Sequence, residues 1–263
     1  MNMIRGFFIN LQFFTSIPIP FQLSMDKQAV KRSVQMFPIL GILQGLLYAS
    51  ILYGLIQWTP FTPLASAFLF TLFTIIFTGG LHLDGWIDTS DAFFSYREKE
   101  KRLEIMKDPR VGAFGVLSVI ILLSSRFFFF YEVTLFVQPS SYFLVALVPF
   151  LSRSMMGYFL LSIQTAKKEG LGYFLQQAAD KTALWIYPFY FFIVFILLAI
   201  FNKDALFGGF ILLLVIVFLA IFFFYKIRSW FGGITGDVLG ASVEGAEAVL
   251  WRTVWLLHYF VMG

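Results

Sequence analysis

Long apolar stretches, separated by short polar segments, make up most of this chain. Seven of them approach the ~20 residues that a helix needs to cross the hydrocarbon core of a bilayer. The pattern predicts an all-α polytopic membrane protein with about seven transmembrane helices in a single integral membrane domain. The last stretch begins at Glu247 and contains Arg252, so an interfacial or re-entrant helix is the alternative there. The predicted spans cover residues 34–57, 66–83, 113–137, 142–163, 184–201, 206–225 and 247–262.

The first residues carry an apolar face over a shorter length. Apolar side chains recur there at helical spacing but do not extend far enough to span a bilayer. We expect a short N-terminal interfacial helix, followed by a turn at Pro18 and Pro20. A single early positive charge, Arg5, and polar residues within the apolar stretch argue against a cleavable signal, so the mature chain is expected to begin near Met1. The apolar face consists of Ile4, Phe7, Phe8, Leu11 and Phe14.

Composition supports a membrane protein and excludes several chemistries. Of the 263 residues, 59% are apolar and only 13% are charged, which is too few to cover a soluble protein of this length. The chain has no cysteine, and this excludes disulfides, thiolate metal sites and a cysteine nucleophile. The net charge of +4 would suit an anionic partner, but in a membrane protein the distribution of charge says more than its sum. We expect the lipid bilayer, and no nucleic acid, as a partner.

The basic residues fall on one side of the predicted topology. Fifteen of the nineteen Lys and Arg residues lie in the N-terminal segment and in the loops 84–112, 164–183 and 226–246. The opposite loops hold only Lys203, and the remaining three arginines lie inside predicted spans. By the positive-inside rule, we expect the N-terminus and the charged loops to be cytoplasmic.

Three carboxylates follow the second predicted span, in the sequence Gly-Gly-Leu-His-Leu-Asp-Gly-Trp-Ile-Asp-Thr-Ser-Asp from residue 79 to residue 91. Asp84, Asp88 and Asp91 are spaced to share one face of a helix, where like charges repel unless a cation lies between them. Carboxylates without cysteine favour Mg²⁺ or Mn²⁺, ions that usually keep water and substrate phosphate in their shells. The alternative is a solvated acidic helix start. His82 lies off the acidic face and is a candidate for substrate binding, for a general base or for packing.

Basic residues and glycines follow in the segment 104–115, Glu-Ile-Met-Lys-Asp-Pro-Arg-Val-Gly-Ala-Phe-Gly. Lys107 and Arg110 are candidates for holding phosphate oxygens. Gly112 and Gly115 would let a phosphate approach the backbone closely. The alternating charges of residues 97–102 are instead typical of a solvated helical face.

Two arginines lie near the middle of predicted spans, where a charge costs at least ~2.5 kcal/mol. Arg126 and Arg153 therefore each need a partner or a wet cavity. Glu132 is six residues from Arg126, on the wrong side of a helix to pair with it, so we expect both arginines to find partners on other spans. For Arg153, two interpretations stay open, binding of a substrate anion and a purely structural role.

A second glycine-rich segment, residues 232–244, repeats the arrangement of the first. Gly-Gly precedes Asp237 by the same spacing as it precedes Asp84, and another acid follows each aspartate seven residues later. The match is either chance or a weak pseudo-repeat that brings two carboxylate pairs to one cytoplasmic cavity. A motif of small residues that packs helices together is a further alternative, but it does not explain Asp237 and Glu244.

These segments resemble the cobalamin synthases, formally the adenosylcobinamide-GDP ribazoletransferases. The resemblance lies in residues 11–20, 79–91, 104–115 and 232–241, with shorter matches at 151–153 and 169–172, and so covers nearly the whole chain. The family's reaction joins adenosylcobinamide-GDP to the ribose of α-ribazole, or of its 5′-phosphate, and releases GMP. The resemblance implies an Mg²⁺-dependent phosphotransferase in the inner membrane of a prokaryote, and it leaves open contacts with other corrinoid-assembly enzymes or with a second copy of the chain.

The family in turn resembles the membrane CDP-alcohol phosphotransferases, whose Asp-Gly and paired Asp motifs bind metal and a nucleotide diphosphate. Asp84 and Gly85 match that pattern, but Leu81 stands where the larger family has an earlier Asp, and Asp88 replaces the small residue before its Arg. The metal ligands cannot be copied from that family. We expect a fold like that of these enzymes.

A catalytic arrangement follows from the acids and the resemblance together. We expect Asp84 and Asp88 to bind Mg²⁺ on the pyrophosphate, Asp91 or Asp237 to complete the metal site, and one of these acids to accept the proton of the ribose hydroxyl. Mn²⁺ is the alternative ion.

Phosphate binding and the rival functions complete the expectations. Lys107, Arg110 and Arg153 would orient the phosphates, with Gly112 and His82 as further substrate-binding residues. One rival is a CDP-alcohol-type phosphotransferase that acts on lipid. The other is a divalent-cation transporter, which would place its carboxylates near the middle of the bilayer.

Overall fold

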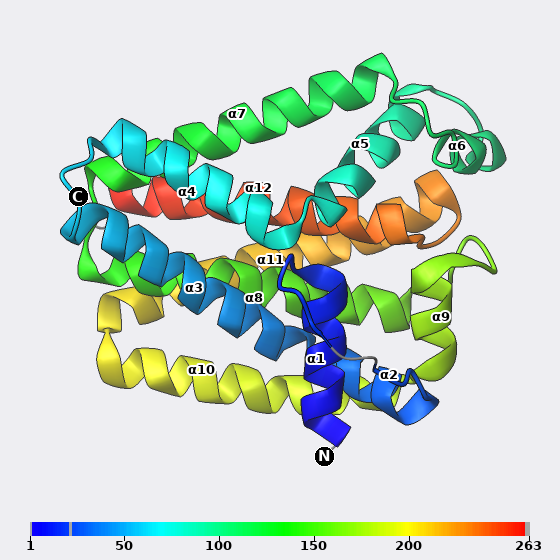
Figure 1. Cartoon of the computed structure of the whole chain (residues 1–263), viewed down its shortest axis with the longest axis horizontal. Coiled ribbons are helices and arrows are strands. Elements are labelled where there is room, and N and C mark those ends of the chain that lie inside the picture. The colour runs from blue at the N-terminus through cyan, green and yellow to red at the C-terminus, as the bar shows by residue number, and fades with distance from the viewer. Residues whose placement is uncertain (1, 21–22, 261–263) are drawn as a thin grey trace.

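The computed structural model describes residues 2–20 and 23–260, and all the regular elements within these ranges are helices (Figure 1). The prediction of an all-α membrane protein is confirmed at this level. Met1 and the end of the last predicted span, residues 261–262, lie outside the described residues. The helices are α1 (Asn2–Phe14), α2 (Lys27–Gln35), α3 (Phe37–Gln57), α4 (Pro63–Thr78), α5 (Leu81–Phe94), α6 (Lys99–Ile105), α7 (Ala113–Leu135), α8 (Pro139–Ser162), α9 (Gly170–Ala178), the 3₁₀ helix η1 (Lys181–Ile186), α10 (Tyr187–Phe201), α11 (Lys203–Phe231) and α12 (Gly236–Phe260).

Five helical segments in the described part of the chain are long and apolar enough to cross a membrane. They are α3, α7, α8, α11 and the continuous segment formed by η1 and α10. The pair α4 and α5 supplies a sixth candidate if both are taken as one bent span. The seventh predicted span corresponds to α12, which starts eleven residues before Glu247. This helix is not among the candidate spans because every stretch of it that is long enough contains too many charged residues.

The second predicted span, residues 66–83, ends earlier than expected. Gly79 and Gly80 both have positive φ angles, of 64° and 75°, which glycine adopts without steric cost. These two residues end α4, and α5 leaves at 89° to it. The acidic segment therefore starts a new helix and does not prolong the apolar one.

Helix α8 lies at the centre of the bundle (Figure 1). In its most apolar stretch, 89% of the residues are buried inside the protein, against 33% or less in the other four candidate spans. Helices α3, α11 and α12 pack against it. Because lipid can solvate an apolar outer face, only this central helix needs to be covered by protein on nearly all sides.

The polar connections gather at one end of the molecule (Figure 1). Helices α6 and α9 lie there, together with the α11–α12 connection, and α12 runs back from it packed against α5, α7 and α8. The predicted N-terminal helix is present as α1, and its apolar side chains Leu11 and Phe14 are buried. This end of the bundle holds the candidate site.

Candidate functional site

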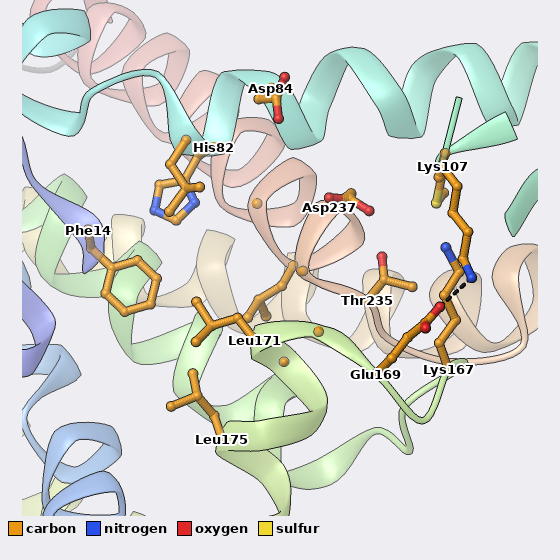
Figure 2. Close-up of a pocket in the computed structure, with 17 residues that line it drawn as sticks. Phe14, His82, Asp84, Lys107, Lys167, Glu169, Leu171, Leu175, Thr235 and Asp237 are labelled. Carbon is orange, nitrogen blue, oxygen red and sulfur yellow. Dashed lines mark hydrogen bonds and ion pairs between the residues drawn. The ribbon is translucent and has the colours of Figure 1, made fainter. Parts of the chain in front are cut away.

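A pocket of about 340 Å³ opens where α5, α9 and the start of α12 meet (Figure 2). This volume falls in the range of small-molecule binding sites. Its walls combine charged side chains with leucines and aromatic rings from segments far apart in the sequence. The lining residues are Phe14, Leu81, His82, Asp84, Met106, Lys107, Lys167, Glu169, Gly170, Leu171, Gly172, Leu175, Thr235, Gly236, Asp237, Leu239 and Gly240.

Two of the predicted acids, Asp84 and Asp237, face this pocket from different helices. Asp84 lies in the first turn of α5 and Asp237 in the first turn of α12. Gly85 explains how they come together, because a Cβ atom on it would lie 2.7 Å from the Asp237 carbonyl oxygen. The two backbones meet at this point, so the predicted convergence of the two glycine-rich segments is present at Asp84 and Asp237.

Asp88 belongs to the same acidic neighbourhood. It lies one turn after Asp84 on α5, beyond the bend that ends the apolar helix α4. Burial, together with the negative charges of Asp84 and Asp237, raises the pKa of Asp88 to about 6. The three carboxylates are thus close enough to repel one another.

Asp91 has a different role in the structure. Its two carboxylate oxygens accept hydrogen bonds from the backbone N–H groups of Gly112 and Gly115, each at 2.8 Å. These two residues form the N-cap and the first turn of α7, where N–H groups lack partners within the helix. Asp91 therefore caps α7 from α5, and the close backbone approach predicted for a phosphate at these glycines is made by this carboxylate.

The described carboxylates at this pocket do not form a closed metal cage. No three His, Asp or Glu side chains in residues 2–20 and 23–260 form a group that could hold a metal ion. Mg²⁺, however, is usually bound by one or two carboxylates together with water and substrate phosphate. Asp84 and Asp237, with Asp88 beside them, fit that mode of binding and do not form a closed protein cage.

Two lysines bring positive charge to the same pocket (Figure 2). Lys107 is one of the predicted phosphate ligands and forms an ion pair with Glu169. Lys167 was missed by the sequence reasoning, although it lies two residues before the Glu-Gly-Leu-Gly segment that starts at residue 169. The backbone of Ile234 bonds to Gln164 and Ala166, each at 2.9 Å, and this holds the Lys167 loop beside the start of α12.

The charge of Lys167 is affected by its surroundings. Burial lowers its pKa, the charge of Lys107 lowers it further, and Asp237 acts in the opposite direction. Two lysines with the single carboxylate of Glu169 leave a net positive charge, which favours the binding of a further anion.

Arg110 and Arg153 do not reach the pocket. The Arg110 side chain is 86% exposed and donates hydrogen bonds to Asp108. Arg153 is buried in the bundle, 3.6 Å from Glu247 of α12. Neither arginine is therefore positioned to contact a phosphate in this pocket, the contact that was predicted for both.

Both intramembrane arginines have partners on another helix, as predicted. Arg126 of α7 pairs with Glu244, and Arg153 of α8 pairs with Glu247, which also accepts a hydrogen bond from Ser152 at 2.8 Å. Glu244, the second acid of the glycine-rich segment, thus joins α12 to α7 inside the bundle and does not face the pocket.

His82 lines the pocket beside Phe14 (Figure 2). The two rings are stacked, with centroids 5.9 Å apart and an interplanar angle of 14°. The Nε2 atom of His82 is buried and has no hydrogen-bond partner among the described residues. A substrate contact by His82 stays a prediction, and the unpartnered Nε2 atom supports it.

Comparisons with known proteins were made on the whole chain. The family model described as cobalamin-5-phosphate synthase matches residues 6–255. Proteins named adenosylcobinamide-GDP ribazoletransferase are similar over nearly their full length: 40% identity in Geobacillus kaustophilus, with 98% of both chains covered, and 32% in Clostridioides difficile, with 97% of this chain and 99% of the relative covered. A Geobacillus sp. relative is 38% identical, with 98% of this chain and 97% of its own covered. No solved structure matches this chain.

Proposed function

We propose a mechanism for this chain, which belongs to the cobalamin-5-phosphate synthase family and is an enzyme of the kind its relatives are named for, an adenosylcobinamide-GDP ribazoletransferase. Its substrates are accordingly adenosylcobinamide-GDP and α-ribazole or its 5′-phosphate, and we place their reaction in the pocket between α5, α9 and α12. The observation that carries this placement is the convergence of Asp84 and Asp237 with Lys107 and Lys167 on one cavity.

The chemical step breaks the phosphoanhydride bond of the donor and forms a phosphate ester to the ribose. A ribose hydroxyl oxygen attacks the phosphorus that bears the cobinamide, the new O–P bond forms, and the bond from that phosphorus to the bridging oxygen breaks. GMP leaves with that oxygen, and the hydroxyl proton passes to a carboxylate of the Asp84, Asp88 and Asp237 group. Lys107 and Lys167 hold the phosphate oxygens in line for attack.

The same carboxylates suit a divalent cation. Asp84 and Asp237, with Asp88 beside them, would hold Mg²⁺, which when bound neutralises charge on the phosphates and on the leaving GMP. Mn²⁺ would suit the same oxygen donors. We leave Asp91 out of this set because its oxygens are used by Gly112 and Gly115.

The corrin ring must lie outside the pocket. A cavity of about 340 Å³ accommodates a nucleoside with phosphate groups but not a macrocycle. The exposed apolar faces of the surrounding helices would provide a binding surface for the ring at the membrane boundary. This division of the substrate, together with the Asp84-Gly85 pair, supports the likeness to CDP-alcohol phosphotransferases.

We place the protein in the inner membrane of a bacterium, with the pocket end of the molecule facing the cytoplasm. The support is the concentration of Lys and Arg in the N-terminal segment and in the loops around α6 and α9. We retain α12 as the seventh crossing, because its 25 residues are long enough and its two glutamates pair inside the bundle.

Substitutions of the two pocket acids test the site. Asp84→Asn and Asp237→Asn keep the side-chain size and remove the charge. We expect GMP release by the detergent-purified protein to fall by about 100-fold or more in each variant, because charge stabilisation at the reacting phosphate is lost.

Asp204→Asn is the matched control, since Asp204 is exposed in the first turn of α11 and does not line the pocket. It should keep the wild-type rate. GMP release within threefold of wild type by Asp84→Asn or Asp237→Asn, in protein that elutes as the wild type does, would remove that acid from the active site.

A further inference from the structure

The pocket has two chemically different ends (Figure 2). Lys107, Lys167 and Glu169 gather at one end, and Phe14 and His82 lie at the other. Asp84 and Asp237 lie between the two groups. Leucines line the wall near the aromatic end, notably Leu171 and Leu175. The catalytic steps proposed above use the acids and the lysines and leave the aromatic end without a role.

The aromatic end consists of two stacked rings with one polar atom that lacks a partner. Phe14 is 5% exposed and His82 is 3% exposed, so both side chains are packed in the protein interior. The Nε2 atom of His82 is buried without a hydrogen-bond partner in the part of the chain that the structure describes. A buried polar atom in this condition carries a free-energy penalty, which a ligand relieves if it supplies the missing hydrogen bond.

The leucine side chains around these rings offer nothing to a polar ligand. Beside Phe14, the side chains of Leu81, Leu171, Leu175 and Leu239 face the pocket, and none of them can form a hydrogen bond. A flat, largely apolar ligand with a single hydrogen-bonding atom matches this end. A ligand with several polar atoms on its edge would leave most of them unsatisfied.

We propose that this end of the pocket binds the aromatic base of α-ribazole, with the Nε2–H of His82 donating a hydrogen bond to the unsubstituted ring nitrogen of the benzimidazole. This inference rests on the proposed function and assigns a subsite within the same pocket. One benzimidazole nitrogen carries the ribose, the other is a free acceptor, and the rest of the base is hydrocarbon. The base thus has one free acceptor nitrogen for the one unpartnered ring nitrogen of His82.

The guanine of the donor substrate does not match the aromatic end. Guanine has acceptors at O6 and N7 and a donor at its N2 amino group, and the apolar end has no partners for all of these. The diphosphate to which guanine is attached is attracted to Lys107 and Lys167. The aromatic end is therefore left to the base of α-ribazole.

The order of groups along the pocket also suits the reaction. His82 and Asp84 are two residues apart on α5, and Asp237 meets α5 at Gly85. A nucleoside whose base lies against His82 and Phe14 directs its ribose toward the two acids. The attacking hydroxyl is then placed between the base subsite and the lysine end, where the pyrophosphate lies.

A change to the ligand alone tests the hydrogen bond. The probe is 1-ribosyl-5,6-dimethylindole in the same α configuration, which replaces the free ring nitrogen of α-ribazole with C–H and keeps the shape. We expect the wild-type kcat/KM, measured as GMP release from adenosylcobinamide-GDP, to be about three- to tenfold lower with the indole nucleoside. This comparison does not depend on the folding of any variant.

The matching protein change is His82→Phe, which keeps a ring and removes the donor. In this variant the preference for benzimidazole over indole should disappear, while the KM for adenosylcobinamide-GDP stays at the wild-type value. His258→Phe is the control, because it makes the same replacement at the other buried histidine, which contacts Ser141 and does not line the pocket. It should keep the wild-type preference between the two nucleosides.

Three results would overturn the subsite. The first is equal use of the two nucleosides by the wild-type enzyme. The second is an unchanged preference in His82→Phe. The third is a rise, in His82→Phe, of the KM for adenosylcobinamide-GDP instead of the KM for α-ribazole. The last result would place guanine at the aromatic end. Absence of GMP release from the wild-type protein with α-ribazole would instead refute the proposed function. The subsite, which depends on that function, would then be refuted as well.

Discussion

Single residues in this protein are used differently from what their spacing in the sequence indicates. Asp84, Asp88 and Asp91 are equivalent by spacing, yet Asp84 faces the pocket and Asp91 caps α7. A helical period identifies the face of a helix but not the backbone that another helix presents to it. The position of Asp91 on the same helix as Asp84 was therefore predictable, whereas its partners, two backbone N–H groups from residues 112 and 115, were not.

Asp91→Asn separates capping from metal binding. The amide has one acceptor oxygen for two N–H donors, so we expect the protein to lose ~1–2 kcal/mol of stability, the size of a helix cap. The measurements are the melting temperature in detergent and the Mg²⁺ concentration that gives half-maximal GMP release. We expect the first to fall and the second to stay at its wild-type value. An unchanged melting temperature with a tenfold higher Mg²⁺ requirement would return Asp91 to the metal ligands.

At the scale of the helices, two breaks bring the acids together. The α4–α5 break at Gly79 and Gly80 turns the acidic segment away from the apolar helix, and Gly232, also with a positive φ, ends α11 before α12. The repeat of Gly-Gly before an aspartate was visible in the sequence. The contact between the two segments at Gly85 was not, because it depends on how α5 packs on α12.

Gly85→Ala tests the contact between these helices. The added methyl group would lie 2.7 Å from the Asp237 carbonyl oxygen, and backbone atoms cannot move aside as a flexible side chain does. We expect α12 to shift and GMP release to fall by about 100-fold, since small displacements at reacting groups are costly. The measurement is kcat at saturating concentrations of both substrates.

Gly54→Ala is the control for this change. Gly54 lies in α3, and a Cβ atom there would meet only the Trp58 side chain at 3.6 Å, an ordinary contact. It should leave kcat at the wild-type value. If Gly85→Ala were as active as Gly54→Ala, the close packing of α5 on α12 at Asp237 would be wrong.

At the scale of the whole molecule, the charge distribution and the site agree. The loops that hold most of the Lys and Arg residues surround the end of the bundle with the pocket (Figure 1). Helix positions were predictable because a bilayer requires long apolar segments. The apolar wall of the pocket was not, since its leucines and Phe14 look like any other apolar residues until the helices are assembled. Lys167 was hidden for the same reason, in a loop that carries three basic residues.

Cysteine labelling in cells tests the orientation. The chain has no cysteine, so each introduced one is a unique reporter. Lys101 and Lys203 are both exposed, at opposite ends of the predicted topology. In intact cells a membrane-impermeant maleimide should label Lys203→Cys, and it should label Lys101→Cys only after the membrane is opened. The reverse pattern would place the pocket outside the cytoplasm.

The most direct measurement for the account as a whole is GMP release by the purified wild-type protein. The protein in detergent is incubated with adenosylcobinamide-GDP, α-ribazole and Mg²⁺, and GMP and the joined corrinoid are measured together over time. We expect the two products to appear in equal amounts, and neither to form without α-ribazole or without a divalent cation. Absence of both products, under conditions where a relative from Geobacillus kaustophilus forms them, would contradict this expectation.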